Sequence, residues 1–493
     1  MPEDLSILQD EEIQAKRPIR SRNGCLTCRR RKKKCDESRP SCAGCQRNHL
    51  ECQWESSDSL LKPRRRYRRP SLAENSNSLP EEIQRRMNIF FVLTPDLVYR
   101  LLGHFLDDSP KWLSTRTGSR RTDYLKWLSP AISNSPLVLN CILAIASADL
   151  LKYDRGSREI RRVAVEYYGK AVSGLRTAIN DEMAIASPSY AFAPDYTPLA
   201  VLLLCVHETQ NFTESERILP HLNAAVFLLQ NRISHRSTDI GMRGFLFETF
   251  CYFFSLASFS LGSKLPLFQA SRIFNEPMVI EHLRTGHIMG TSQHLFIAIY
   301  RVSSLAQTLT SGNPKEVSVA TSELASLDED LASKHPRPDF GHNMNIEDLN
   351  DAVTSELYRL ACRIHIKKLL VSSAPDEESA VFSMVEDFID KLRLLPSNSP
   401  SQSILSWPLV VAGFSATTSG QQRIIVAKLA QIHDEWQSAI FSKGAAYLQE
   451  KWRRDKYLNH CHHDSDSTSS STRSRQTYDE IRTTWEKCPV ILA

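Results

Sequence analysis

Six cysteines near the start of the chain are the residues whose type and spacing point most clearly to a particular chemistry. They lie within 28 residues and repeat one half-pattern, C-x2-C-x6-C, twice; the six are Cys25, Cys28, Cys35, Cys42, Cys45 and Cys52. The first fifteen residues carry five acids and no base, unlike the basic start of a secretory signal, which predicts an intracellular protein. In such a protein this thiol pattern predicts metal binding rather than disulfides.

Two zinc arrangements could use these thiols. One four-thiolate site would leave two reactive thiols in a basic setting that lowers their pKa. Two tetrahedral zinc ions have eight ligand positions between them, and six thiolates fill all eight if two of the sulfurs bind both metals. The spacing alone leaves both arrangements open.

Positive charge is concentrated around the same segment. Residues 16–70 hold 18 Lys and Arg against five Asp and Glu, whereas the whole chain of 493 residues carries a net charge of only +5. A field of this sign attracts polyanions. It predicts a nucleic-acid-binding module attached to a nearly neutral body, with a nuclear-import signal as the alternative use of the basic residues.

The residues around the cysteines match a known family. The segment Cys25-Leu-Thr-Cys28-Arg-Arg-Arg-Lys-Lys-Lys-Cys35-Asp36, followed by Arg39-Pro40-Ser41-Cys42-Ala-Gly-Cys45, resembles the fungal Zn2Cys6 binuclear-cluster transcription factors. The resemblance implies two Zn²⁺ per chain, with Cys25 and Cys42 as the bridging ligands and Pro40 turning the chain between the two halves. It also implies that the partner is double-stranded DNA and that the target is a CGG-type triplet.

The basic run after Cys28 contains no Gly, Pro or β-branched residue, and it predicts a short helix ending near Cys35. By the resemblance, this helix enters the major groove, where Lys32, with Arg31 beside it, reads the two acceptors on the edge of guanine. The other basic residues are expected to contact phosphates, which add affinity without sequence information. They are Arg29, Arg30, Lys33, Lys34 and Arg47, with Arg64, Arg65 and Arg66 in the segment that follows.

A polar, basic linker follows the cysteine module. Its run from 62 to 70 predicts an extended arm along the phosphate backbone, a nuclear-import signal, or both. Many relatives continue with a dimerising coiled coil, which takes roughly three to four heptads. Here the apolar repeat of Ile83, Met87 and Phe90 is much shorter. We therefore expect a homodimer or heterodimer to form through the body of the protein.

The body, from about residue 88 to 460, is a succession of helical patterns. Thr94-Pro95 and Ser135-Pro136 each pair an N-cap residue with a proline suited to the first turn. An apolar stripe runs from Ile160 to Ala178, and further periodic stretches cover 198–209, 217–230, 243–261, 295–310, 349–372, 379–394 and 420–452. Because Glu248 interrupts the most apolar stretch, 245–261, we expect a buried core helix there and no contact with a membrane. The predicted fold class is all-α.

Several segments of the body, including Asn134–Ala144 and Ser406–Gly413, are similar to the second, shorter type of fungal-specific transcription factor domain. The resemblance implies a large helical regulatory region that is not an enzyme. The predicted organisation is a disordered N-terminus (1–20), the Zn2Cys6 module (21–55), the linker (56–87), the helical regulatory domain (88–460) and a Ser/Thr-rich, disordered tail (461–493).

No catalytic motif contradicts this interpretation: P-loop, GxGxxG, HExxH and GxSxG patterns are all missing. Cys141, Cys205, Cys251 and Cys362 lie in apolar helical stretches and are expected to be buried. The sequence predicts a nuclear regulator of RNA polymerase II transcription that contacts the transcription machinery or coregulators. Two alternatives remain open, a DNA-bound repressor or corepressor platform and a chromatin-localised protein that binds a metabolite.

Overall fold

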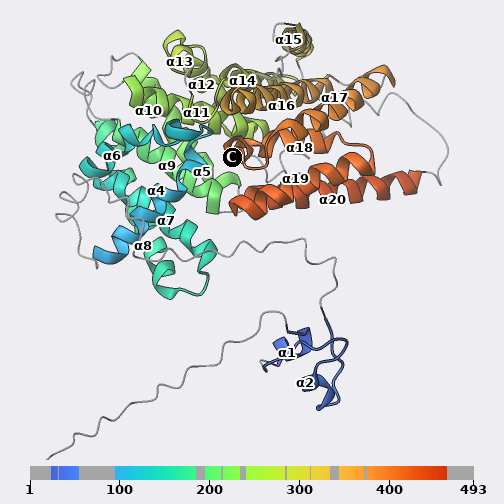
Figure 1. Ribbon diagram of the computed structural model, residues 1–493. Helices are drawn as coiled ribbons and strands as arrows, with labels where there is room; N and C mark the ends of the chain where they lie inside the picture. The colour runs from blue at the N-terminus through green and yellow to red at the C-terminus, as the bar shows by residue number, and fades with distance from the viewer. Residues whose placement is uncertain are drawn as a thin grey trace, which may run out of the picture. The chain divides into compact units, whose positions relative to one another are not determined.

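The computed structural model describes residues 24–31, 33–54, 95–184, 195–211, 215–233, 240–283, 286–310, 313–333, 344–370 and 375–462. The chain forms two units, residues 1–74 and 75–493. Every regular element within the described ranges is a helix, which confirms the predicted all-α class (Figure 1). The first unit contains α1 (Leu26–Arg30) and α2 (Ala43–Gln46).

The second unit is the helical body. Its first half contains α4 (Pro95–Asp108), α5 (Pro110–Leu113), η2 (Gly118–Thr122), α6 (Leu125–Asn134), α7 (Pro136–Tyr153), α8 (Arg158–Ala184), α9 (Tyr196–Asn211), η4 (Ser215–Ile218), α10 (Leu219–Ile233) and α11 (Ile240–Leu261). Its second half contains η5 (Gly262–Lys264), α12 (Leu267–Phe274), α13 (Pro277–His282), α14 (Gln293–Thr308), α15 (Pro314–Ser333), α16 (Ile346–Leu369), α17 (Pro375–Leu394), η7 (Pro400–Ile404), α18 (Ser406–Phe414), α19 (Ser419–Trp436) and α20 (Ala439–His462).

Local sequence explains where several of these helices begin. The Ser135 side chain accepts the N–H of Val138 at 3.3 Å, and proline occupies the first position of α7, as the sequence predicts. At α19, the Thr418 hydroxyl accepts the Gln421 N–H, and the Gln421 side chain accepts the Thr418 N–H. This capping box satisfies two N–H groups that the helix itself leaves unpaired.

The stretch 420–452 forms two helices, although its sequence pattern predicts one. α19 ends at Trp436, and Gln437 takes a left-handed backbone conformation with φ of 52°. The Gln437 N–H bonds to the His433 carbonyl at 2.8 Å, which closes the helix before the chain reverses into α20. The two helices then pack side by side along one edge of the body (Figure 1).

One continuous hydrophobic core runs through the body, from Val98 in α4 to Trp452 in α20. Helix α11 lies at its centre with nearly all of its side chains buried, and four cysteines of the body are buried as predicted, namely Cys141, Cys205, Cys251 and Cys362. Among the described residues, two helical segments are long and apolar enough to cross a membrane, Pro136–Tyr153 and Ile240–Lys264, but 61% and 89% of them are buried inside the body. That burial is typical of core helices.

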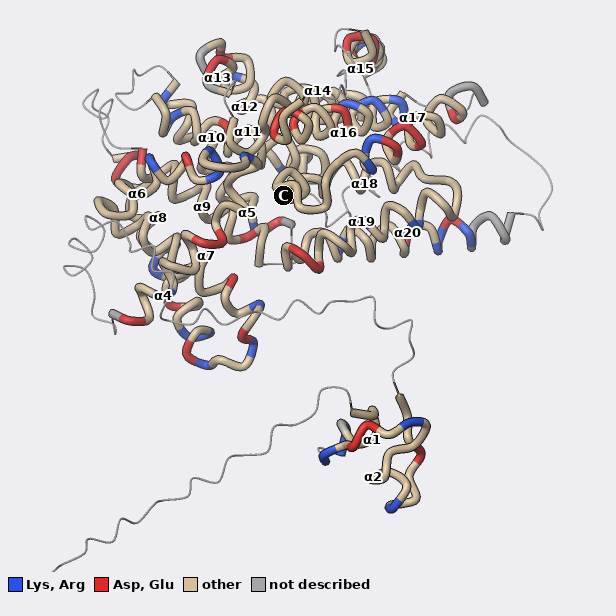
Figure 2. The backbone as a smooth tube through the Cα atoms, viewed as in Figure 1, with Lys and Arg blue, Asp and Glu red and all other residues tan. Residues whose placement is uncertain are grey.

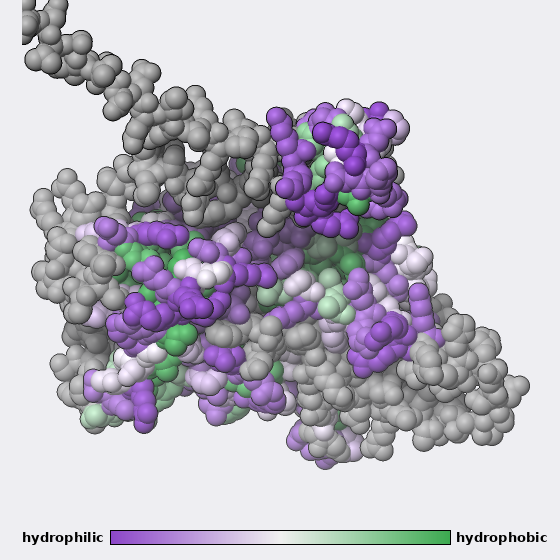
Figure 3. Space-filling model, turned by 90° about the horizontal axis from the view of Figure 1, so that it is seen from below, coloured by the Kyte–Doolittle hydropathy of each residue, from purple (hydrophilic) through white to green (hydrophobic). Residues whose placement is uncertain are grey.

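Pairs of neighbouring helices organise this core. α7 packs against α8, α9 and α4; α11 packs against α14; and α16 packs against α17 and α18. Charges of both signs are spread over the outer helices (Figure 2). On the face shown in Figure 3, apolar residues form separate patches between hydrophilic ones.

Buried polar contacts join distant parts of the body. The Glu248 carboxylate in α11 accepts the backbone N–H groups of His287, Ile288 and Met289 at 2.6 to 2.8 Å. Desolvation raises the pKa of Glu248, and these three N–H groups oppose that rise. The contact ties the loop before α14 to the central helix.

Candidate metal centre and nucleic-acid interface

The six cysteines predicted to bind metal come together in the first unit. Their sulfurs approach one another closely: the Sγ atom of Cys42 is 3.7 Å from that of Cys25 and 3.6 Å from that of Cys28. Two thiolates on one tetrahedral zinc, each about 2.3 Å from the metal, lie about 3.8 Å apart. The observed separations therefore fit thiolates that share a zinc ion.

The sulfurs form two overlapping groups of four. In each group, all Sγ atoms lie within 4.8 Å of one another; one group is Cys25, Cys28, Cys35 and Cys42, and the other is Cys25, Cys42, Cys45 and Cys52. Cys25 and Cys42 belong to both groups. Each group is a four-thiolate set of the kind that holds a structural zinc.

The repeated sequence pattern is also a repeated structure. The Cys25 N–H bonds to the Cys35 sulfur at 3.4 Å, and the Cys42 N–H bonds to the Cys52 sulfur at 3.3 Å. The N–H groups of Cys28 and Cys45 bond in the same way to the sulfurs of Cys25 and Cys42, both at 3.3 Å. Such N–H donors stabilise sulfur in its thiolate form.

Without metal the thiols differ in acidity. Desolvation raises the pKa of Cys25, Cys28 and Cys45 to about 12, whereas the backbone N–H of Cys45 lowers the pKa of Cys42 to about 6. A divalent cation stabilises the thiolate form of its ligands. Bound zinc would therefore supply the positive charge that lets these buried sulfurs lose their protons together.

Residues beside the cysteines fix the two halves of the module to each other. The Trp54 indole N–H donates to the Pro40 carbonyl at 2.8 Å, and the Arg39 guanidinium lies 4.7 Å from the centre of the Trp54 ring. These contacts hold the end of the module against the turn at Pro40, where the Arg39–Pro40 peptide bond is cis. The sequence reasoning missed Trp54, although its place two residues after the last cysteine was a usable signal.

Asp36 makes a second connection between the halves. Its carboxylate accepts the Ser38 hydroxyl at 2.7 Å and the Ala43 N–H at 3.1 Å, at the start of α2. These hydrogen bonds lower the pKa of Asp36, so the exposed carboxylate stays ionised. Thr27 completes the connection, since its hydroxyl donates to the Glu51 carbonyl at 2.7 Å.

Close packing restricts Gly24, which precedes the first cysteine. A Cβ atom at position 24 would lie 2.7 Å from the Cβ of Cys35. At Gly44, which lies between Cys42 and Cys45 in the second half, a Cβ would meet its nearest neighbour, the Cys28 sulfur, at an ordinary 3.5 Å. The requirement for glycine is therefore specific to position 24, and the sequence reasoning missed it.

The basic residues lie on and after α1. The helix ends at Arg30, earlier than predicted, and the Lys33 N–H then bonds to the Cys28 carbonyl at 3.1 Å. The chain leaves the helix there because Cys35 has to return to the side of Gly24 and Cys25. The side chains of Arg30, Arg31, Lys33, Lys34 and Arg47 are exposed. Lys32, the Arg29 side chain and Arg64, Arg65 and Arg66 lie outside the described residues.

Two of these cations have partners within the module. Arg30 donates to the Gln53 side-chain carbonyl at 3.4 Å, and the Arg47 Nε donates to the Ala43 carbonyl at 3.3 Å. Neither contact neutralises a charge, so both guanidinium groups can still attract an anion.

The family of the chain follows from this fold and this site. Residues 23–61 match the fungal Zn(2)-Cys(6) binuclear cluster domain, and residues 100–488 match the fungal specific transcription factor domain. The chain belongs to the fungal transcription factor family that these two domains define. Its cluster domain binds two zinc ions.

Curated relatives each match less than half of the chain. Transcription factor lfc1 of Flammulina velutipes is 53% identical over 55 residues, which are 11% of this chain and 18% of that protein. White-opaque regulator 2 of Candida albicans is 49% identical over 53 residues, which are 11% of this chain and 12% of that protein. The aspercryptin biosynthesis cluster-specific transcription regulator atnN of Emericella nidulans is 25% identical over 253 residues, 47% of this chain and 39% of that protein. The chain thus spans less than half the length of these relatives, and no solved structure matches it.

Proposed function

We propose that this protein works in the nucleus as a regulator of RNA polymerase II transcription that recognises CGG-type triplets. The observation that supports this most directly is the sharing of Cys25 and Cys42 by both groups of four thiols. A bridged cluster of this kind holds the segment after α1 as a rigid, exposed and basic surface, which suits docking to DNA.

In the proposed cluster, Cys25 and Cys42 each bind both zinc ions. Cys28 and Cys35 complete the first metal site, and Cys45 and Cys52 complete the second. Six thiolates around two Zn²⁺ leave the cluster with a net negative charge, which the exposed Arg and Lys residues around it offset. Pro40 turns the chain between the halves.

In the proposed complex, Lys32, with Arg31 beside it, reads guanine in the major groove, because cationic donors fit the O6 and N7 acceptors of that base. The phosphate contacts come from the other basic residues, Arg29, Arg30, Lys33, Lys34, Arg47, Arg64, Arg65 and Arg66. These contacts give affinity and orientation without sequence information.

The helical body supplies the regulatory part of this proposal. In this proposal, residues 88–460 form the regulatory domain, and the linker at 56–87 joins it to the module at 21–55. The body makes the homodimer or heterodimer contact and meets the transcription machinery or coregulators. We propose no catalytic role for the body.

The test is binding-site selection from random DNA with the full-length protein, followed by affinity measurements on a CGG site and on a scrambled site. Lys32→Ala should cost about 1–3 kcal/mol on the CGG site and much less on the scrambled site. The matched control is Lys34→Ala, which should weaken both alike and reduce the salt dependence by roughly one unit. Equal losses on both sites for Lys32→Ala would refute the assignment of base reading.

A further inference from the structure

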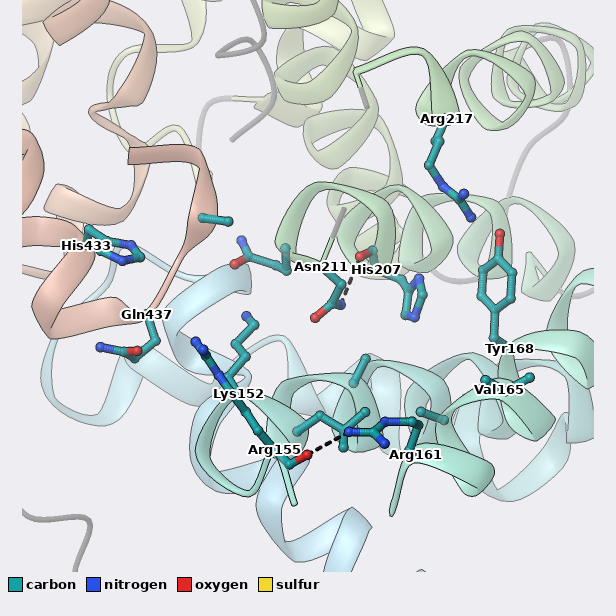
Figure 4. A pocket seen from close by; sticks show the side chains of 15 residues that line it. Lys152, Arg155, Arg161, Val165, Tyr168, His207, Asn211, Arg217, His433 and Gln437 are labelled. Atoms are coloured by element: carbon teal, nitrogen blue, oxygen red, sulfur yellow. Dashed lines mark hydrogen bonds between the residues drawn. The ribbon is translucent and has the colours of Figure 1, made fainter. Parts of the chain in front are cut away.

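A cavity of about 550 Å³ lies in the helical body, where segments distant in sequence meet. Its walls come from the C-terminal ends of α7 and α9, the first half of α8, η4 and the turn between α19 and α20. Figure 4 shows Lys152, Arg155 and Arg161 on one side of this space, and His433 and Gln437, from the α19–α20 turn, on another. The volume lies within the range of pockets that hold metabolite-sized molecules.

The charged side chains among the described residues that line the cavity are all positive. They include Lys152, Arg155, Arg161 and Arg217, and no Asp or Glu is among the described residues that line it. Two of these cations are paired with carboxylates just behind the wall: Lys152 with Asp149 and Arg217 with Glu208, each at 2.8 Å.

The other two cations, Arg155 and Arg161, form no ion pair within the described part of the chain. They contact each other instead, since the Arg161 side chain donates to the backbone carbonyl of Arg155 at 2.7 Å. This contact fixes the position of Arg161 without neutralising it. A pocket with two uncompensated guanidinium groups favours an anion.

A buried polar group in the same wall also points to a ligand. The Gln210 side chain lines the cavity, is only 7% exposed, and has a buried Oε1 atom with no hydrogen-bond partner among the described residues. Buried polar groups are nearly always paired, because an unpaired one costs free energy. A hydrogen-bond donor on a bound molecule would pair with Oε1. If the amide is rotated by about 180°, its NH2 group takes this place, and an acceptor on the bound molecule would pair with it.

Apolar side chains line the rest of the cavity. Leu151 lies in its wall, and Val165 lies there with 70% of its surface exposed, although its neighbours Val163 and Ala164 are buried. The exposed Val165 side chain could contact the hydrocarbon part of an amphipathic molecule, while the arginines of the same cavity contact its charged group.

We propose that this cavity binds a small organic anion, with a carboxylate or phosphate group held by Arg155 and Arg161 and an apolar body against Leu151 and Val165. The planar guanidinium fork binds either oxyanion through paired hydrogen bonds. A ligand in this position touches both α8 and the α19–α20 turn, and so it links the first helices of the body to the last. This makes the body a sensor for a metabolite, which goes beyond the proposed recognition of DNA and does not depend on it.

The experiment measures binding of four probes to the full-length protein by calorimetry and by thermal shift. The probes are 4-phenylbutyrate, its neutral amide, phenyl phosphate and inorganic phosphate. The test variant is R155Q/R161Q. Its matched control is R158Q/R162Q, which removes the same charge from exposed arginines of α8 that do not line the cavity.

We expect 4-phenylbutyrate, phenyl phosphate or both to bind and to raise the melting temperature, and the tighter of the two identifies the anionic group. The neutral amide and the R155Q/R161Q variant should each weaken binding by about tenfold or more, since charge-assisted hydrogen bonds are lost. The control variant should bind as the wild type does. Absence of binding by both organic anions, equal binding of the amide, equal losses in the two variants, or inorganic phosphate binding as tightly as phenyl phosphate would each overturn the proposal.

Discussion

The Sγ atoms of Cys25 and Cys42 lie 3.7 Å apart, at the point where the two halves of the cysteine module meet. Each sulfur lies close to the two other cysteines of its own half and also to those of the other half. Cys25 and Cys42 are therefore the two residues that the groups of four share. The two residues also occupy the same position in the repeated sequence pattern, as the first cysteine of each half. An internal duplication thus places one shared ligand from each half at the centre.

The first prediction concerns these two cysteines. Cys25→Ala or Cys42→Ala in the full-length protein should remove both zinc ions, because each change takes a ligand from both metals and breaks the bridge. Cys28→Ala or Cys52→Ala should leave more zinc bound, since each removes a ligand from one metal only. The measurement is the zinc content per chain by mass spectrometry after gel filtration. Equal zinc loss in all four variants would contradict the bridged arrangement.

The second prediction concerns glycine in the same module. Gly24→Ala places a methyl group against the Cβ of Cys35 and should destabilise the module by about 1–3 kcal/mol, the usual cost of overpacking. Gly44→Ala is the matched control, because the added methyl makes only ordinary contacts and should cost much less. Zinc transfer to a chelator, followed by absorbance, should be faster for Gly24→Ala than for the wild type. A faster transfer from Gly44→Ala than from Gly24→Ala would show that the packing argument is wrong.

Local patterns in the sequence were sufficient to predict the cluster and the fold class. The cysteine spacing indicated a metal site, and Ser135-Pro136 marked the start of α7, because both signals depend on residues close together in the chain. The early end of α1 and the break at Gln437 were not predictable in this way. Each depends on where a later segment has to go, Cys35 in one case and α20 in the other.

The cavity and the contact between Trp54 and Pro40 were not predicted because both depend on residues far apart in the sequence. The cavity combines Arg161 of α8 with Gln210 of α9 and Gln437 of the last turn, and no spacing rule connects these residues. The clamp between Trp54 and Pro40 is similar, because a tryptophan and a turn become partners only once the cluster has folded. Such pairings follow from the tertiary structure and leave no periodic trace in the sequence.

The third prediction concerns acid stability. Burial lowers the pKa of His287 to about 4, against about 6.5 for an ordinary histidine, and its ring lies 5.2 Å from that of Trp127. Between these two pH values the unfolded chain binds a proton that the folded chain does not bind. The free energy of unfolding should therefore fall as the pH drops below about 6.5 and continue to fall until about pH 4.

His287→Gln tests this expectation, because glutamine does not titrate. From pH 7 to pH 5.5 the wild type should lose roughly 1 kcal/mol more stability than the variant, whatever the absolute stability of the variant. Urea unfolding followed by circular dichroism at both pH values gives the difference. Parallel losses in the two proteins would mean that His287 does not contribute to the acid sensitivity.

The last prediction concerns assembly on DNA. We expect the full-length protein to pair through its helical body, and we expect residues 1–80 to remain monomeric. The apolar repeat of Ile83, Met87 and Phe90 is too short for a stable coil, because isolated helices under about 12–15 residues are marginal in water. One triplet also discriminates poorly against a genome of competing sites, so a second half-site bound by a second copy or another protein is needed.

Sedimentation separates the two possible origins of a dimer. The full-length protein and a variant with alanine at positions 83, 87 and 90 should form dimers to the same extent, with and without DNA that carries two triplets. Symmetric pairing through one shared surface is the commonest form of soluble assembly, and the large helical body offers room for it. A variant that becomes monomeric would show that the short repeat is sufficient. A full-length monomer that binds a single triplet tightly would refute pairing through the body altogether.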